Sequence, residues 1–248
     1  MHPLTQKIAL VTGASRGIGA AIAARLAQDG ADVAFTYASD AGGAATTLAA
    51  IEGHGRKGLA IRANNKSAAE VEAAVAQTVA AFGRIDILVN NAGIYRAGTI
   101  DTLTLDDFDD TMAINLRAAF VASKAAAAGM ASGGRIISIG SNLAVRAPGQ
   151  GMSIYTASKA ALTGLSQGMA RDLGPRGITV NVVHPGSTDT DMNPADGPHA
   201  GSQRSLMATG GAAYAAPSEV AGVVAFLASP QAQSVTGAAW TIDNGANA

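Results

Sequence analysis

The sequence predicts one doubly wound α/β domain, in which a parallel sheet carries helices on both faces. Short apolar runs alternate with longer stretches of helical character along all 248 residues. The runs lack a regular polar–apolar alternation, as expected for strands that are buried on both faces. A glycine-rich turn, 13–19, stands between the first run and the first helix. A single α/β domain is commonly of this length, and no internal boundary or repeat interrupts the pattern.

Each element follows from a local pattern. We expect strands at residues 7–12, 31–37, 57–62, 85–90, 134–140, 178–183 and 238–242. We expect helices at 20–28 and 67–82, from 106 onward, and at 153–173 and 217–228. The segment 187–216 is rich in Gly, Pro and Ser and is long for a loop, so we expect a mobile substrate lid there.

Composition excludes several classes of function. Charged residues make up 14% of the chain and the net charge is −1, which is no footprint for nucleic acid. Cysteine is absent, so disulfides, thiolate nucleophiles and cysteine-ligated metals are excluded. No His and carboxylate cluster has the spacing of a metal site. No apolar run approaches the ~18 residues of a membrane span, and we expect a soluble cytoplasmic protein.

The glycine turn predicts a phosphate cradle. Gly13, Gly17 and Gly19 give the spacing G-x-x-x-G-x-G directly after the first strand. Small residues let the backbone approach a pyrophosphate, which then meets the N-terminus of the following helix. A glycine-rich turn by itself is more often only a turn. Its position between strand and helix favours a dinucleotide site here.

The end of the second strand predicts the choice of dinucleotide. An acidic residue there would select NAD by binding the ribose 2′-hydroxyl. This chain instead has Tyr37 and Ser39, and Asp40 is better placed to cap the next helix. Arg16 in the glycine turn can reach a 2′-phosphate, although it is also explained as a solvated surface residue. We therefore expect NADPH, with NADH less favoured.

The later strands add polar groups at their carboxyl ends. Asn91, Ala92 and Gly93 follow the fourth strand, which suits a crevice where the backbone approaches a ligand. Carboxylates at 106–110 are explained by the dipole of the helix that begins there. Asn115 lies within that helix, where it either disturbs the helix usefully or is simply tolerated.

Tyr155 and Lys159 predict proton-transfer chemistry. Residues four apart on a helix share a face. A phenol titrates near ~10 and is a poor acid or base at neutral pH. An ammonium about 5 Å away, at an effective dielectric constant of ~20, favours the phenolate by roughly 3 kcal/mol. We therefore expect Lys159 to lower the pKa of Tyr155 towards the working range of a general acid or base.

These motifs together resemble the short-chain dehydrogenase/reductase family, in particular the members of about 250 residues that include β-ketoacyl-ACP reductases. The resemblance covers residues 1–248 in order. It implies a single-domain Rossmann fold with a seven-stranded parallel sheet in the order 3-2-1-4-5-6-7. It also implies an enzyme that transfers a hydride between a nicotinamide and a CH–OH or C=O group.

The resemblance assigns roles to individual residues. Tyr155 gives a proton to the carbonyl oxygen, Ser141 holds that oxygen by a hydrogen bond, and Lys159 binds the nicotinamide ribose. Asn115 fixes a water in a proton relay to Lys159. The implied cofactor residues are Gly13, Ser15, Arg16, Gly17, Ile18, Gly19, Tyr37, Ser39, Asn64, Asn91, Ala92, Gly93, Tyr155, Lys159, Pro185, Gly186, Thr188 and Thr190.

Three features depart from the family pattern. Asn64-Asn65 stands where an aspartate usually lies beside the adenine. The usual Asp-Gly-Gly near the C-terminus is Asp243-Asn244-Gly245. Ser141 lies 14 positions (155 − 141) before Tyr155, one more than in many relatives. Ser138 and Ser153 are rivals for the serine role, but Ser138 lies within a strand and Ser153 better suits a helix cap.

The substrate site is expected to have mostly apolar walls and to take a ketone, an aldehyde or the matching alcohol. The expected wall residues are Leu143, Tyr95, Met152, Met192, Leu206 and Tyr214. Small residues on the helices that carry Asn115 and Tyr155 favour close contact between copies, and the family implies a homotetramer.

One alternative belongs to another functional class. The stretch 174–194 and the ending Thr241-Ile242-Asp243 resemble a bacterial regulator of biofilm dispersal that binds cyclic di-GMP on this same fold. A non-catalytic binder of cyclic di-GMP or NADPH therefore remains open. A tuned phenol beside a lysine favours catalysis, because a pure binder does not need one.

Overall fold

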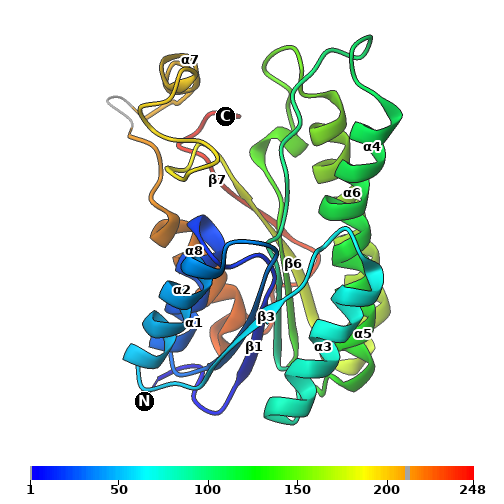
Figure 1. The fold of residues 1–248 in the computed structure, drawn as a ribbon, viewed down its shortest axis with the longest axis vertical. Helices are drawn as coiled ribbons and strands as arrows, with labels where there is room; N and C mark the ends of the chain where they lie inside the picture. Colours follow the sequence, from blue (N-terminus) through cyan, green and yellow to red (C-terminus); the bar gives the residue numbers. More distant parts are fainter. Residues whose placement is uncertain (1, 210–212) are drawn as a thin grey trace.

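A seven-stranded, all-parallel sheet forms the centre of the protein in a computed structural model that describes residues 2–209 and 213–248 (Figure 1). The order β3-β2-β1-β4-β5-β6-β7 confirms the expected topology. Every predicted strand is present, with each end at the predicted residue or within two residues of it. The strands are β1 (Ile8–Val11), β2 (Asp32–Tyr37), β3 (Gly58–Arg62), β4 (Ile87–Asn90), β5 (Arg135–Ile139), β6 (Thr179–Pro185) and β7 (Ala239–Ile242).

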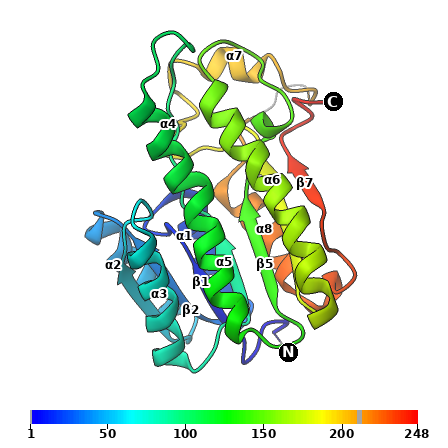
Figure 2. The ribbon, with the colours of Figure 1, turned by 90° about the vertical axis from the view of Figure 1, so that its right-hand side faces the viewer.

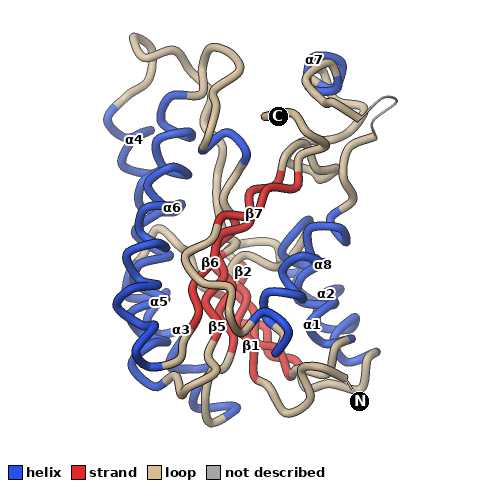
Figure 3. Tube along the Cα trace, turned by 180° about the vertical axis from the view of Figure 1, so that it is seen from behind, coloured by secondary structure: helices blue, strands red, loops and turns tan. Residues whose placement is uncertain are grey.

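Two layers of helices enclose the sheet, as Figures 1 and 3 show from opposite sides. One layer is formed by α1 (Gly17–Gln28), α2 (Ala41–Gly53) and α8 (Pro217–Ala228). The other is formed by α3 (Ala68–Phe82), α5 (Ala118–Gly129) and α6 (Ser153–Leu173), which face the viewer in Figure 2. No described helix is long and apolar enough to cross a membrane.

Burial on both faces explains why the strand sequences do not alternate. All four residues of β1 are buried. Ala9 and Val11 pack in the core beneath α1 and α8, whereas Leu10 packs in the second core with α3 and α5. Successive side chains of a strand point to opposite faces, so both faces demand apolar residues. Each large aliphatic side chain buried this way contributes roughly 1.5–3 kcal/mol.

The helix starts carry the expected capping groups. The Asp40 carboxylate accepts a hydrogen bond of 2.9 Å from the Gly43 N–H and caps α2, as predicted. Thr104 and Asp107 form a capping box at the start of α4 (Leu105–Met112). Ser153 is different, because it is the first residue of α6 and the preceding Met152 makes no side-chain cap. The prediction that Ser153 caps this helix is therefore wrong.

The predicted lid segment has structure of its own. It contains the short helix α7 (Ala200–Arg204), beside which the C-terminus lies in Figure 1. Gln203 of α7 accepts hydrogen bonds at its Oε1 from Ser187 Oγ (2.6 Å), Asn193 Nδ2 (3.0 Å) and Tyr214 OH (2.8 Å). One half-buried amide thus holds together the described parts of this segment. Residues 210–212 lie outside the described residues.

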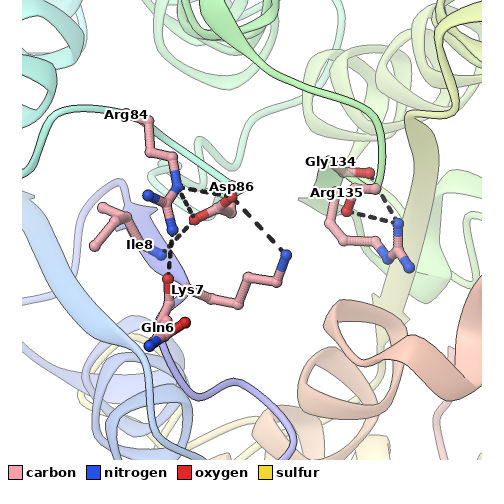
Figure 4. Close-up of polar contacts among 8 residues, drawn as sticks. Gln6, Lys7, Ile8, Arg84, Asp86, Gly134 and Arg135 are labelled. Atoms are coloured by element: carbon pink, nitrogen blue, oxygen red, sulfur yellow. Dashed lines mark hydrogen bonds and ion pairs between the residues drawn. The ribbon is translucent and has the colours of Figure 1, made fainter.

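A carboxylate, that of Asp86, links the amino-terminal ends of β1 and β4 (Figure 4). Asp86 Oδ2 accepts hydrogen bonds from the Ile8 main-chain N–H (2.8 Å) and from Arg84 Nε (3.0 Å). Arg84 also donates to the Gln6 carbonyl oxygen at 2.6 Å. These bonds connect the start of β1 to the residue before β4. They fix the far ends of two strands whose carboxyl ends build the site.

Candidate active site

The glycine turn is held against the end of β4 by close backbone contact. Gly13 has φ +65°, and a Cβ there would come within 2.8 Å of Ala92 Cα. A Cβ on Gly19 would lie 2.3 Å from the Gly13 carbonyl oxygen and 2.4 Å from Asn91 Nδ2. Both positions therefore require glycine, for conformation at Gly13 and for space at Gly19.

Thr12 and Asn91 fasten the turn from two sides. Thr12 Oγ1 accepts the main-chain N–H groups of Asn91 (3.0 Å) and Ala92 (3.1 Å). In return, Asn91 Nδ2 donates to the carbonyl oxygens of Thr12 (3.0 Å) and Gly13 (2.7 Å). The ends of β1 and β4 are thus one hydrogen-bonded unit, which leaves the turn fixed before any ligand arrives.

The end of β2 presents cations and no carboxylate. Arg16 precedes α1 and is largely exposed, with Asp191 of the predicted lid segment 3.8 Å away. An exposed pair at this distance is weak, so Arg16 is free to engage a ligand. The sequence reasoning missed Arg62 at the end of β3, whose Nε donates to the Ala38 carbonyl oxygen at 3.2 Å. Its register partner is Tyr37.

Other predicted cofactor residues lie around this edge. Asn64 accepts a hydrogen bond of 2.9 Å from the Lys66 N–H in the turn after β3. Thr190 lies over the glycine turn, because a Cβ on Gly17 would be 3.4 Å from its Cγ2. Gly186 allows β6 to approach the end of β7, since a Cβ there would be 2.5 Å from the Cβ of Asp243.

Asn115 lies in a π-helical turn, Ala113–Arg117, that joins α4 to α5. The structure thus decides the open question in favour of a disturbed helix. Its Oδ1 accepts the Ile94 N–H (2.8 Å), and its Nδ2 donates to the Ile94 carbonyl oxygen (3.0 Å) and to Ser158 Oγ (3.0 Å). The buried amide therefore holds the segment after β4 against α6.

Lys159 is buried, with 4% of its surface exposed, although it carries an ammonium group. Its Nζ donates to the Ile139 carbonyl oxygen at 2.9 Å and lies 5.8 Å from the centre of the Tyr155 ring. A Cβ on Gly93 would come within 3.3 Å of both this Nζ and Asn115 Oδ1. The structure thus brings residues from β4, β5 and α6 around one nitrogen.

The pKa values of Tyr155 and Lys159 shift in opposite directions from their ordinary values. Burial raises the pKa of Tyr155 to about 12, a hydrogen bond from Ser141 lowers it in part, and Tyr95 raises it further. Burial lowers the pKa of Lys159 to about 8. The expectation that Lys159 brings the pKa of Tyr155 down towards neutral pH is therefore wrong. Desolvation outweighs the charge because apolar surroundings disfavour both the phenolate and the ammonium.

Ser141 is the serine at the carboxyl edge beside Tyr155. It is buried two residues after the end of β5, its Oγ accepts the Leu143 N–H at 3.2 Å, and its own N–H donates to His184 Nδ1 at 3.0 Å. Ser138 is buried within β5, and Ser153 is exposed at the start of α6. Among the three serines, Ser141 is the one that follows the strand end and partly lowers the pKa of Tyr155.

The predicted substrate residues differ in their surroundings. The Tyr95 ring meets the Tyr155 ring edge-on, with centres 5.0 Å apart. Met192 and Leu206 are 59% and 39% exposed, so their apolar surfaces are open. Tyr214 is buried and its hydroxyl donates to Gln203, so it stabilises the predicted lid segment from within.

The sequence reasoning missed His184, Thr12 and Gln203 as well as Arg62. The signal for His184 was its position at a strand end, one residue before Pro185-Gly186. Thr12 had the same signal, at the end of the first strand. Gln203 had none, since a glutamine in a polar loop is ordinary. No cluster of three or more His, Cys or carboxylate side chains able to hold a metal occurs within residues 2–209 and 213–248.

Known proteins resemble this chain over nearly its whole length. Residues 13–247 match the family model described as Enoyl-(Acyl carrier protein) reductase. A solved short chain dehydrogenase from Burkholderia cenocepacia J2315, in complex with NADP, is 59% identical, with a TM-score of 0.97 and coverage of 99% of this chain and 100% of that one.

Two curated relatives point in different directions. The chain is 48% identical to the cyclic-di-GMP-binding biofilm dispersal mediator protein of Escherichia coli (strain K12), over 98% of each chain. It is 42% identical to a 3-oxoacyl-(acyl-carrier-protein) reductase of the same organism, over 96% of each chain. The likeness therefore includes both a protein named for binding a nucleotide and a protein named for a reduction.

The buried lysine predicts a pH-dependent stability. As pH falls from 10.5, an unfolded lysine binds a proton that the folded Lys159 accepts only near pH 8. The folded state should therefore lose about 3 kcal/mol across this interval. Lys159→Met has no such group, so its unfolding free energy relative to wild type should rise as pH falls. Urea unfolding at several pH values measures this, and a constant difference would contradict the burial argument.

Proposed function

The chain belongs to the short-chain dehydrogenase/reductase family of NAD(P)-dependent oxidoreductases, and from this premise we propose an NADPH-dependent carbonyl reductase that can also run as an alcohol dehydrogenase. The observation that carries the proposal is the convergence of Tyr155, Ser141 and Lys159 at one strand end, where Ser141 partly lowers the pKa of the phenol and Lys159 Nζ lies 5.8 Å from the centre of its ring. A proton donor, a fixed hydroxyl and a buried cation are what reduction of a carbonyl group needs.

The residues around the glycine turn fit a dinucleotide. Gly13 and Gly19 pack against Ala92 and Asn91 at the end of β4, which fixes the turn so that its main-chain N–H groups and the N-terminus of α1 can receive a pyrophosphate. Thr190 and Gly93 line the path from this turn towards Lys159. Bound along that path, the nicotinamide supplies the hydride for the carbonyl carbon.

Tyr155 is the proposed proton donor. A phenol with a pKa near 12 is protonated at neutral pH, which is the form that reduction consumes. Ser141 has its Oγ accepting from Leu143, so its hydroxyl hydrogen is directed elsewhere, to the phenol or to a carbonyl oxygen. A donor already aimed at the oxygen stabilises the negative charge that develops there.

Lys159 and Asn115 are proposed to support the donor. With a pKa near 8, Lys159 is mostly charged at neutral pH, and its positive charge favours the phenolate that forms when Tyr155 gives up its proton. It is also the proposed partner of the nicotinamide ribose. A water relay at Asn115 would use the main-chain oxygen of the π-helical turn, because the side-chain amide already binds Ile94 and Ser158.

The substrate is proposed to be a ketone or an aldehyde without an obligatory charged group. Tyr95 stands edge-on to Tyr155, and Met192 and Leu206 expose apolar surface. Leu143 and Met152 come from the segments that flank the donor. The segment 187–216, held by Gln203, is the proposed lid of a single domain that spans residues 1–248.

A regulator that binds cyclic di-GMP is the second candidate. It is favoured by the 48% identity to a dispersal mediator named for that ligand. A binder would need phosphate and base contacts, and no proton donor. Calorimetry with cyclic di-GMP, next to NADPH oxidation against a panel of carbonyl compounds, separates the two functions.

The proposed assembly is a homotetramer of closed symmetry. Helices α4 to α6 carry a hollow of about 640 Å³ whose lining includes Leu116, Phe120, Ala161 and Leu165. Phe120 is 48% exposed there, although it is large and apolar. Trp240, packed beside Phe226, is 36% exposed on the edge strand β7, which supplies a second face for contact.

Tyr155→Phe should remove most NADPH-dependent turnover, by about 100-fold or more, because proton transfer contributes 10²–10⁴-fold. NADPH affinity should change less than about twofold, since the phenol is needed for the transition state and not for holding the dinucleotide. Initial rates and a fluorescence titration with NADPH measure the two effects. Turnover at half the wild-type level would end the case for this mechanism.

Arg16→Ala should weaken the binding of NADPH more than the binding of NADH. A charge-assisted contact of ~1.5–3 kcal/mol to the 2′-phosphate corresponds to a preference of roughly 10- to 150-fold. The measurement is kcat/KM for both cofactors, with Arg171→Ala as the matched control on an exposed arginine of α6. Equal losses for both cofactors, or a wild type that prefers NADH, would refute the assignment.

Phe120→Glu should break one of the two proposed interfaces and leave a dimer, because a carboxylate would be buried against a second copy. Light scattering at micromolar concentration gives the mass directly. Val79→Glu, a comparable change at an exposed apolar residue on α3, should stay tetrameric. A monomeric wild type would contradict the assembly.

A further inference from the structure

His184 is a buried imidazole that the proposed chemistry does not use. It lies near the end of β6 with 1% of its surface exposed. It stands between the main chain of Ser141, which follows β5, and Thr163 on α6. One ring therefore bridges the strand that carries the proposed oxygen-binding serine and the helix that carries Tyr155 and Lys159.

The hydrogen bonds define the tautomer of the ring. The main-chain N–H of Ser141 can only donate, so His184 Nδ1, 3.0 Å away, must carry its lone pair there. The neutral ring then holds its hydrogen on Nε2, which faces Thr163 Oγ1 at 3.3 Å. Thr163 Oγ1 in turn donates to the Lys159 carbonyl oxygen at 3.2 Å. The donors run in one direction from Ser141 to the main chain of Lys159.

The backbone of β5 is shaped around this ring. A Cβ on Gly140 would lie 2.3 Å from His184 Nδ1 and 2.6 Å from its Cε1. Gly140 itself donates its N–H to the Val183 carbonyl oxygen at 2.7 Å. Glycine before the serine thus lets the imidazole lie against the strand. The contact fixes the direction in which Ser141 leaves β5.

We propose that neutral His184 is a positioning residue that holds Ser141 in register with the helix of Tyr155 and Lys159. This inference rests on the proposed carbonyl reduction. His184 touches no reacting atom in the proposed reaction and acts through the main chain of Ser141. A proton on Nδ1 would set two N–H donors against each other, so the protonated ring would release the serine.

The groups around the ring keep it neutral. Lys159 on α6 is the cation that faces it, and burial together with this charge lowers the pKa of His184. Tyr155 on the same helix is protonated at neutral pH. On the flanking strands, β5 carries only Arg135 at its far end and β7 carries no titratable side chain. Asp243, after β7, accepts hydrogen bonds from the N–H groups of Gly245 (3.0 Å) and Asn247 (3.2 Å).

Two substitutions separate this role from simple packing. His184→Asn places an amide oxygen near the position of Nδ1, where it can accept from Ser141, and does not titrate. His184→Leu fills similar space without an acceptor. We expect His184→Leu to lower kcat by about 10- to 100-fold, the cost of a displaced oxygen donor. NADPH affinity should stay within about twofold. His184→Asn should remain within about threefold of wild type.

The pH profile gives a readout that packing alone would not move. Wild-type kcat should fall at acid pH as His184 is protonated, and this fall should shift to lower pH or disappear in His184→Asn. Nitrogen-15 spectra of histidine-labelled protein should show one ring with its hydrogen on Nε2 that stays neutral below pH 6.5, and His184→Asn should remove that signal.

The outcomes are distinguishable. An active wild type with His184→Leu at half its kcat or more overturns the positioning role. So does an acid limb that is unchanged in His184→Asn, or a ring that carries its hydrogen on Nδ1. A wild type that reduces no carbonyl in the panel overturns the proposed function and the positioning role together.

Discussion

The buried ammonium of Lys159 is the constraint on which the site depends. A cation with 4% of its surface exposed must be compensated by oriented dipoles, and here the Ile139 carbonyl oxygen accepts from it. That bond ties the helix α6 to the end of β5. A Cβ on Gly93 would lie 3.3 Å from both the Lys159 Nζ and Asn115 Oδ1, so the backbone after β4 passes close to the ammonium. The order of the sheet brings these three elements to one edge.

Much of the fold could be predicted because the local sequence of each strand indicates that the strand is buried. The four buried residues of β1 and the capping carboxylate of Asp40 need no distant information. Within one helix, spacing also places Tyr155 beside Lys159. The direction of the Tyr155 pKa could not be predicted in this way. It depends on desolvation by several elements, and sequence spacing reports only the nearest charge.

Contacts between different strands and helices could not be predicted from the sequence either. His184 binds Ser141 across two strands and Thr163 on a helix, and no local pattern joins these positions. The π-helical turn at Asn115 could not be predicted from the sequence. Asn is a poor helix former, but a helix can either tolerate it or be disturbed by it. In each case, the missing information was which polar groups would be buried together. The alternation of strands and helices predicts which residues lie at the carboxyl edge of the sheet. Only the packing of the elements determines which of these residues bind one another.

The C-terminal residues show how one departure from the family pattern can be absorbed. Asn244 replaces the glycine of the usual Asp-Gly-Gly and has φ +55°, a conformation that Asn tolerates better than most residues. Its carbonyl oxygen accepts the Ala208 N–H at 2.9 Å, and its Nδ2 donates to the Ala213 carbonyl oxygen at 3.2 Å. Asn247 Nδ2 donates to the Asn142 carbonyl oxygen at 2.7 Å, directly after Ser141. The main chain and the side chain of Asn244 together therefore join the tail to residues on both sides of 210–212, and Asn247 connects the tail to the loop of the proposed catalytic serine.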